Sequence, residues 1–121
     1  MTTLAAGVAD AAPAAGGFNC YTDVCFYYDR SQQGSNWGGS RAGVADFGGI
    51  TFPQDGADGH GQHVKNNAAS AENDTPLWLC VYYDENFTGA VDKIAPGSGA
   101  NLVNTLNENA SYTTETEPQY C

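Results

Sequence analysis

Short apolar and aromatic runs alternate with glycine, asparagine, aspartate and serine along most of the chain. The clearest runs, at 24–28 and 78–83, consist largely of β-branched and aromatic residues, which predicts two β-strands. Segments 35–52 and 89–103 predict further short strands with turns between them. No segment has a long apolar period of 3.6 residues, and 65–73 predicts a turn or two of helix at most. The pattern therefore predicts an all-β fold.

The chain contains an internal repeat. VCFYYDRSQQG at 24–34 and LCVYYDENFTG at 79–89 lie 55 positions apart, share Tyr-Tyr-Asp and end on glycine. A second pair, NNAAS at 66–70 and NENAS at 107–111, lies 41 positions apart. The first copy is therefore longer by about 14 residues, which we place in the segment 52–63. Two copies of strand, hairpin, strand, loop and Asn-rich turn predict a duplicated four-stranded unit.

These motifs resemble those of the βγ-crystallin superfamily. Its Greek-key units carry Y/F-x-x-x-x-F/W-x-G in the first hairpin and N/D-N/D-x-x-S/T-S between the third and fourth strands. The first copy has Gln32 in place of the second aromatic residue, so we expect its hairpin to be less tightly folded. The second copy matches the hairpin pattern in full, with Tyr82, Phe87 and Gly89.

The resemblance implies a sandwich of two four-stranded Greek-key motifs. We expect one domain at 18–121, with the first motif at about 18–75 and the second at about 76–121. Residues 1–17 are rich in alanine, glycine and proline, which predicts a flexible tail. Because each sheet would cover one core, we expect burial to alternate along the strands at 24–28 and 79–83.

The charge balance limits the partners that the protein can bind. Among 121 residues, 14 are Asp or Glu and 4 are Lys or Arg, which gives a formal net charge of −10. Such a surface repels nucleic acid and anionic lipid, whose binding requires clustered cations. No apolar run approaches the roughly 18 residues of a membrane span. We expect a monomer that binds neither nucleic acid nor membrane.

Four cysteines in a short chain favour two disulfides and an oxidising compartment. Three pairings are possible, and we favour a local Cys20–Cys25 bridge and a Cys80–Cys121 bridge that ties the C-terminal residue to the second repeat. The N-terminus lacks the basic start and apolar core of a signal peptide. The expectation of a secreted, extracellular protein therefore rests on the cysteines.

The second copy, CVYYDENFTGAVDKIAPGSGANL, also resembles actinobacterial secreted peptidase inhibitors that have a crystallin-like fold. In members that act on metalloproteases, a rigid surface loop held by a disulfide enters the enzyme cleft. The cysteine that closes this loop is replaced here by YYDEN. The resemblance implies an inhibitory loop with Cys80, Val81, Tyr82, Tyr83 and Phe87.

The superfamily resemblance also implies a low-affinity calcium site. The implied ligands come from the two Asn-rich motifs and are Asn66, Asn67, Ser70, Asn107, Glu108 and Ser111. Oxygen ligands of this kind suit a hard cation, and with one carboxylate among them the expected dissociation constant is about 10⁻⁴–10⁻³ M. The alternative is that these side chains only hydrogen-bond the backbone of their turns.

Enzyme signatures are absent from the sequence. It contains no G-x-S-x-G, no H-E-x-x-H and no phosphate-binding loop. Its two histidines, His60 and His63, lie with Asp55 and Asp58 in the same glycine-rich segment. Zinc or copper binding is conceivable there, but a mobile surface loop is the better interpretation.

Three hypotheses about function follow, all for a secreted protein that is not an enzyme. The first is an inhibitor that docks a rigid loop into an extracellular protease. The second is a calcium-binding structural or stress protein of the crystallin type. The third is an antimicrobial toxin or cell-wall-binding protein that uses exposed aromatic side chains.

Overall fold

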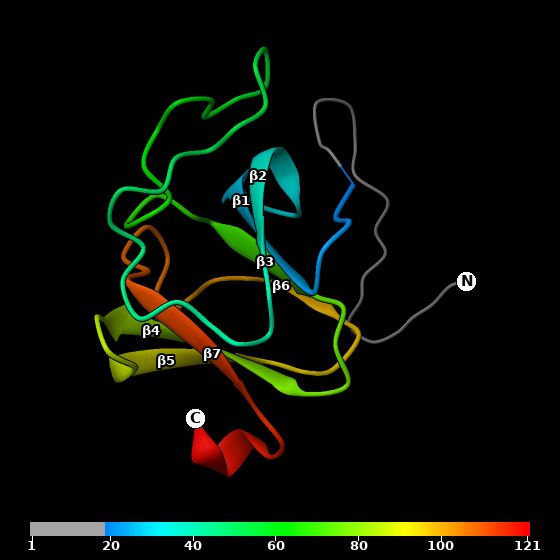
Figure 1. The fold of residues 1–121 in the computed structure, drawn as a ribbon, viewed down its shortest axis with the longest axis vertical. Helices are drawn as coiled ribbons and strands as arrows, with labels where there is room; N and C mark the ends of the chain where they lie inside the picture. The colour runs from blue at the N-terminus through cyan, green and yellow to red at the C-terminus, as the bar shows by residue number, and fades with distance from the viewer. Residues whose placement is uncertain (1–18) are drawn as a thin grey trace.

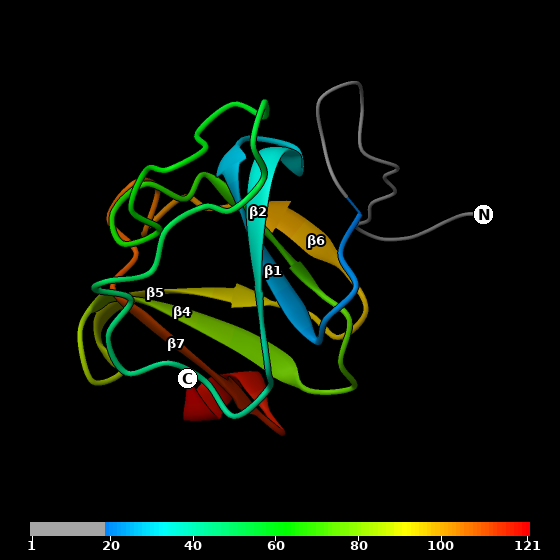
Figure 2. The same ribbon diagram turned by 45° about the horizontal axis from the view of Figure 1, so that its top comes forward.

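The computed structural model describes residues 19–121, so the tail predicted at 1–17 lies outside the described residues. The strands are β1 (Val24–Asp29), β2 (Gln33–Gly39), β3 (Ser70–Asn73), β4 (Trp78–Asp84), β5 (Thr88–Ile94), β6 (Gly99–Asn101) and β7 (Ser111–Glu115). They form two antiparallel sheets, with the orders β2-β1-β3-β6 and β5-β4-β7. The sheets pack as two layers (Figures 1 and 2). The predicted all-β sandwich is confirmed.

The two repeats exchange strands between the sheets. Strand β6 belongs to the second repeat but pairs with β3 of the first. The reciprocal strand of the first repeat is reduced to a single bridge between Val44 and Tyr112. A side chain at Gly43 would place its Cβ 2.6 Å from the carbonyl oxygen of Tyr112, so the segment approaches β7 only through glycine. The second Greek-key motif therefore has the four predicted strands, whereas the fourth strand of the first motif is only this bridge.

The β1–β2 and β4–β5 hairpins have the same register. In the first hairpin Tyr27 pairs with Asn36, and the register then shifts before the pair of Asp29 and Gln33. In the second hairpin the shift falls at the same place, 55 positions later, between the Tyr82 and Asp84 pairs. The predicted equivalence of the strands at 24–28 and 79–83 is confirmed at the level of backbone pairing.

The core between the sheets is strongly aromatic on the side of the first repeat. The rings of Phe26 and Phe47 lie 5.0 Å apart edge to face, and Tyr112 from the second repeat lies 5.1 Å from Phe26. Leu79 and Val81 of β4 complete the contact from the opposite sheet. Rings in these geometries contribute about 0.5–1.5 kcal/mol per pair beyond the burial of their area.

The expected alternation of burial along β1 and β4 is wrong. Residues on both faces of each strand are buried, and these include Cys25, Tyr27, Cys80 and Tyr82. Both strands lie between two neighbours, and further chain covers their outer faces. Cys25 is covered by the segment that carries Cys20, and Cys80 is covered by the C-terminus.

The structure confirms both disulfide pairings. Cys20 is bonded to Cys25, with Cα atoms 5.9 Å apart, and Cys80 is bonded to Cys121, with Cα atoms 5.5 Å apart. The second bridge follows a single 3-10 turn at Pro118–Tyr120, which brings the last residue back to β4 (Figure 1). Each repeat is thus tied on the outer face of its first strand.

Candidate functional site

Each β-hairpin turns on two residues with positive φ, followed two positions later by a glycine with positive φ. Non-glycine residues rarely adopt this conformation, so its occurrence twice shows that the two turns have the same backbone shape. A Cβ atom at either glycine would lie within 3 Å of a carboxylate oxygen from the start of the turn. The positions are Ser31, Gln32 and Gly34 in the first repeat and Asn86, Phe87 and Gly89 in the second.

A buried serine from the Asn-rich motif closes each hairpin. The Ser70 hydroxyl donates to the carbonyl of Asp29 (2.7 Å) and accepts from the N–H of Gln32 (2.9 Å). The Ser111 hydroxyl donates to the carbonyl of Asp84 (2.7 Å) and accepts from the N–H of Phe87 (3.0 Å). These two serines, predicted as metal ligands, therefore bind hairpin backbone that is distant in sequence.

The expectation of a looser first hairpin is wrong. The Gln32 side chain is 8% exposed, whereas Phe87 at the same position of the second repeat is 39% exposed. The Gln32 amide donates to the carbonyl of Ala71 (3.4 Å) and lies against Gly99. A polar side chain thus packs over the neighbouring strands, while the aromatic ring remains at the surface.

The two Asn-rich turns meet at the pseudo-twofold axis. The N–H of Asn66 donates to the carbonyl of Asn109 (2.9 Å), and the N–H of Asn107 donates to the carbonyl of Ala68 (3.0 Å). Both donors have positive φ. We use the word junction for the assembly of one hairpin with the turn that closes it. A junction consists of the hairpin, the serine and Asn-rich turn of the same repeat, and the residue of the other repeat that faces them.

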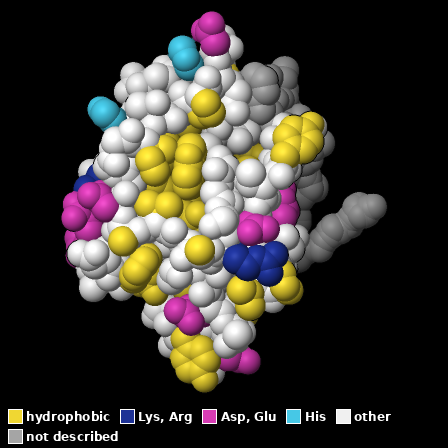
Figure 3. All heavy atoms as spheres, viewed as in Figure 1, with side chains coloured by type: hydrophobic (Ala, Val, Ile, Leu, Met, Phe, Trp, Pro, Cys, Tyr) yellow, Lys and Arg dark blue, Asp and Glu magenta, His cyan; other side chains and the backbone are white. Residues whose placement is uncertain are grey.

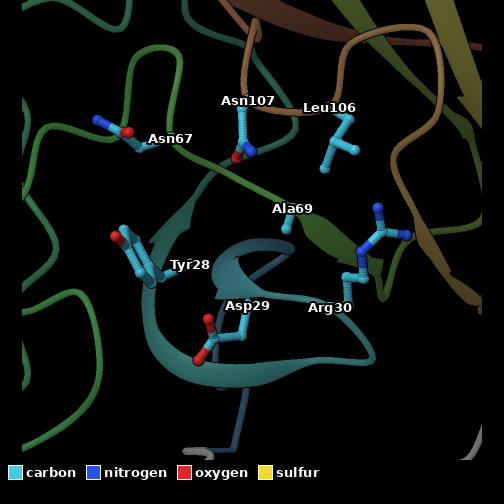
Figure 4. A pocket seen from close by; sticks show the side chains of 7 residues that line it. All are labelled: Tyr28, Asp29, Arg30, Asn67, Ala69, Leu106 and Asn107. Atoms are coloured by element: carbon cyan, nitrogen blue, oxygen red, sulfur yellow. The ribbon is translucent and has the colours of Figure 1, made fainter.

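The first junction encloses a polar pocket (Figure 4). Burial and the neighbouring carboxyl of Asp58 raise the pKa of Asp29 to about 6. The Asn67 amide donates to the carbonyl of His63 (2.9 Å), so its oxygen is left for another partner. The lining residues are Tyr28, Asp29, Arg30, Asn67, Ala69, Leu106 and Asn107.

The second junction contains an ammonium group. Lys65 donates to Asp46 (2.8 Å) and to Glu85, and these hydrogen bonds raise the pKa of Lys65. By the repeat offsets, Lys65 corresponds to Leu106 and Glu85 corresponds to Arg30. The charged side chains of the two junctions therefore differ, although the backbones are alike.

The residues of the two junctions fit calcium differently. The first offers a carboxylate and amide oxygens from Asp29, Asn67 and Asn107 around one pocket, which is a suitable donor set for a hard cation. In the second, Lys65 already supplies the positive charge. Asn66 and Glu108 are exposed there, as Asn107 is in the first. The sequence did not indicate Asp29 or Lys65, because their roles depend on chain segments that meet only in the fold.

The segment with the histidines does not form a metal cluster. His60 lies 3.7 Å from Asp55, and both histidines are exposed at the surface (Figure 3). Among residues 19–121, the group of three potential ligands close enough to share an ion is Cys20, Glu72 and Asp74, and the Cys20 sulfur is in a disulfide. The segment lies at the surface and packs on Tyr28 through Gly59.

A second pair of carboxyl groups lies on the outer face of the first sheet. Burial and the neighbouring Asp74 carboxyl raise the pKa of Glu72 to about 7, against a smaller opposing effect of the Tyr27 hydroxyl. That hydroxyl donates to Glu72 over 3.1 Å. The pair was not predicted from the sequence, although alternate positions of a strand share a face.

The inhibitory loop implied by the resemblance is divided between core and surface. Cys80, Val81 and Tyr82 are buried, whereas Tyr83 is 42% exposed and Phe87 is 39% exposed. The rings of Tyr82 and Phe87 pack edge to face, 6.1 Å apart. Of the residues in this implied loop, only Tyr83 and Phe87, at the end of the β4–β5 hairpin, are exposed to a partner.

The fold is that of solved βγ-crystallin domains. A domain solved in work on the evolution of the eye-lens βγ-crystallin fold has a TM-score of 0.62 at 16% identity, and the match covers 86% of this chain and 95% of that one. A βγ-crystallin from Ciona intestinalis has a TM-score of 0.56 at 18% identity, and the match covers 76% of this chain and 98% of that one. A βγ-crystallin domain from Flavobacterium johnsoniae has a TM-score of 0.57 at 17% identity, and the match covers 78% of this chain and 96% of that one. At these identities the likeness establishes the fold.

The sequence defines a narrower class. Residues 13–94 match peptidase inhibitor family I36. The match covers more than half of the 121 residues, so the chain belongs to this family. No curated protein sequence matches the chain. Among the described residues, no helix has the length and apolar character needed to cross a membrane.

Proposed function

We propose that the protein is a secreted inhibitor of an extracellular protease and that it binds the enzyme through the end of the β4–β5 hairpin. The observation that carries the proposal is the exposure of Tyr83 and Phe87 on the hairpin of a chain that belongs to a peptidase inhibitor family. Aromatic side chains often dominate binding energy when a partner offers them a pocket.

The hairpin is held in place from several sides. Its turn is closed by Ser111, and the N–H of Asn86 donates to the carbonyl of Ala45 (2.9 Å). Lys65 binds Glu85, and the Cys80–Cys121 disulfide fixes the base of β4. A preorganised loop loses less conformational entropy on binding, which supports an inhibitory role without the additional loop disulfide.

A role without catalysis agrees with the side chains present. The four cysteines are in disulfides, and both histidines lie on one exposed segment. The described residues therefore offer no thiol nucleophile and no histidine side chain hydrogen-bonded to a serine. The proposed inhibitor acts by occupying an enzyme cleft.

The test is a panel of secreted metallo-, serine and cysteine proteases assayed with micromolar protein. We expect inhibition of at least one class, and expect Tyr83→Ala and Phe87→Ala each to weaken it about tenfold or more. Tyr21→Ala is the matched control, because Tyr21 is 87% exposed and belongs to neither hairpin. Inhibition of no class, or equal inhibition by all variants, would reject the proposal. A pull-down from culture supernatant that captured only polysaccharide would favour the cell-wall-binding hypothesis.

We also propose a second function, the binding of one calcium ion at the first junction. The donor set of Asp29, Asn67 and Asn107 around a single pocket supports it. The ion would tie the β1–β2 hairpin to both Asn-rich turns. Thermal unfolding in EDTA and in millimolar calcium tests this function, and superimposable curves would exclude it.

A further inference from the structure

The extra residues of the first repeat form a closed loop. We call residues 53–61 the insert. At its base the N–H of Phe52 donates to the carbonyl of Gln62, and the N–H of Gly61 donates back to Phe52, both over 2.9 Å. Thr51 and His63 form a bridge next to this pair. The insert therefore leaves the domain and returns to it at one fixed point.

The insert covers the side of the first hairpin. A Cβ atom built on Gly59 would lie 2.2 Å from the Tyr28 ring, so the bare backbone of Gly59 rests on that ring. The carbonyl of Asp58 accepts from the N–H of Ser35 (2.9 Å), and the Gln54 side chain accepts from the N–H of Asn36 (2.7 Å). The insert thus binds an aromatic face and two N–H groups of β2.

The second hairpin has the same surface without the cover. The offset of 55 positions places Tyr83 at the position of Tyr28 and Ala90 at that of Ser35. Tyr83 and Ala90 are exposed, and no described residue outside the hairpin accepts a hydrogen bond from the Ala90 N–H. The end of this hairpin lies at the edge of the molecule, away from the insert (Figure 1).

We infer that the second hairpin binds an extended segment of its partner in the way that the first hairpin binds the insert. The segment contains a glycine that rests on Tyr83 and presents a carbonyl oxygen to the Ala90 N–H. It carries basic side chains, because Asp84 is exposed beside Tyr83 and the chain has a net charge of −10. The inference concerns the proposed docking hairpin and specifies the partner surface that it recognises.

The probe is a cyclic peptide of residues 52–62 in which Phe52→Cys and Gln62→Cys form a disulfide at the natural base of the insert. Closing the ring reduces the entropy lost on binding. A basic version carries Asp55→Lys and Asp58→Lys. Each peptide is titrated into the ¹⁵N-labelled full chain, and the amide signals of Tyr83 and Ala90 report binding.

We expect the basic peptide to shift both signals and to bind about tenfold more tightly than the acidic one at low salt, with the difference reduced at high salt. In the chain, Tyr83→Ala should weaken binding about tenfold. In the peptide, Gly59→Ala should abolish binding, because the added methyl group would clash with the ring of Tyr83. Gly56→Ala is the matched control, since nothing lies within 4 Å of a Cβ at Gly56.

Three results would overturn the inference: no shift at Ala90 and Tyr83, shifts confined to other regions, or equal binding of the two alanine peptides. The protease panel is read separately. Peptide binding without inhibition of any protease supports the second hairpin as a binding surface and rejects the inhibitory function. Inhibition of a protease without a peptide-induced shift of the Ala90 amide signal supports the inhibitory function and rejects this mode of recognition.

Discussion

The two junctions share one backbone but present different surfaces. Both turn on a pair of residues with positive φ and are closed by a buried serine. The first is covered by the insert and has Arg30 beside an oxygen-lined pocket, whereas the second is uncovered and has Lys65 bound to Glu85. Backbone geometry thus depends on glycine and serine, while exposed positions are free to differ. This separation allows one half to be structural and the other to bind a partner.

The largest expected difference between the halves concerns the disulfides. Replacing Cys80 and Cys121 by alanine should lower the free energy of unfolding by about 4 kcal/mol, because the bridge closes a loop of 41 residues. Replacing Cys20 and Cys25 should cost about 2 kcal/mol, since that bridge spans 5 residues. Urea denaturation of the two double variants measures both values. Equal losses would show that loop length does not set the contribution of these bridges.

The hydroxyl groups of Ser70 and Ser111 should make the next largest contribution to the free energy of unfolding. Ser70→Ala leaves the carbonyl of Asp29 and the N–H of Gln32 without their partner, and each buried unsatisfied group costs about 1–3 kcal/mol. We expect a loss of about 3 kcal/mol for Ser70→Ala and less for Ser111→Ala, whose hairpin is more exposed. Thermal and urea unfolding compare the two variants, with Ser98→Ala as a control hydroxyl that bonds only its own turn. A larger loss at Ser111 would contradict this ranking.

The repeat was visible in the sequence because hairpin glycines and motif serines act through local backbone geometry. The 55- and 41-position offsets predicted which strands and turns correspond, and backbone pairing, positive φ and serine bonds follow them. The pairing of Asp29 with Asp58, and of Lys65 with Asp46 and Glu85, joins segments that lie far apart in the chain. No periodicity encodes such contacts, so the charged part of the site was not predictable. The cover on Tyr28 was missed for the same reason.

The pH dependence of stability should come mainly from the first repeat. The pKa of Asp29 is raised to about 6 and that of Glu72 to about 7, so the folded state binds more protons than the unfolded state at intermediate pH. Stability from these groups is complete below about pH 4 and is lost as pH rises through 6 and 7. Hydrogen bonds with Arg41 and Lys65 lower the pKa values of Asp23 and Asp46, whose contributions are lost only in more acidic solution.

We therefore expect the free energy of unfolding to fall by about 2 kcal/mol between about pH 5 and pH 8, after allowance for solvent screening. Glu72→Gln keeps an acceptor for the Tyr27 hydroxyl but removes the titration, and should remove about half of the slope. Asp29→Asn should remove a smaller part, because Asp29 is less buried. Urea unfolding across this pH range measures the slope, and an unchanged slope in both variants would assign it to other groups.

The smallest expected effect is that of calcium, which distinguishes the junctions most directly. With a dissociation constant of about 10⁻³ M, about 10 mM calcium would stabilise the folded state by about 1.4 kcal/mol through one site. Asp29→Asn should reduce this gain by removing the carboxylate of the first junction. Lys65→Gln should keep it and add a second, weaker binding event, because Glu85 and Asp46 then lose their ammonium partner. Calorimetric titration gives the stoichiometry, and thermal scans in EDTA and calcium give the stabilisation. Binding of two ions by the unmodified chain would show that the Lys65 ammonium group does not take the place of calcium in the second junction. Binding of no ion would show that the first junction is a hydrogen-bonded turn without a calcium site.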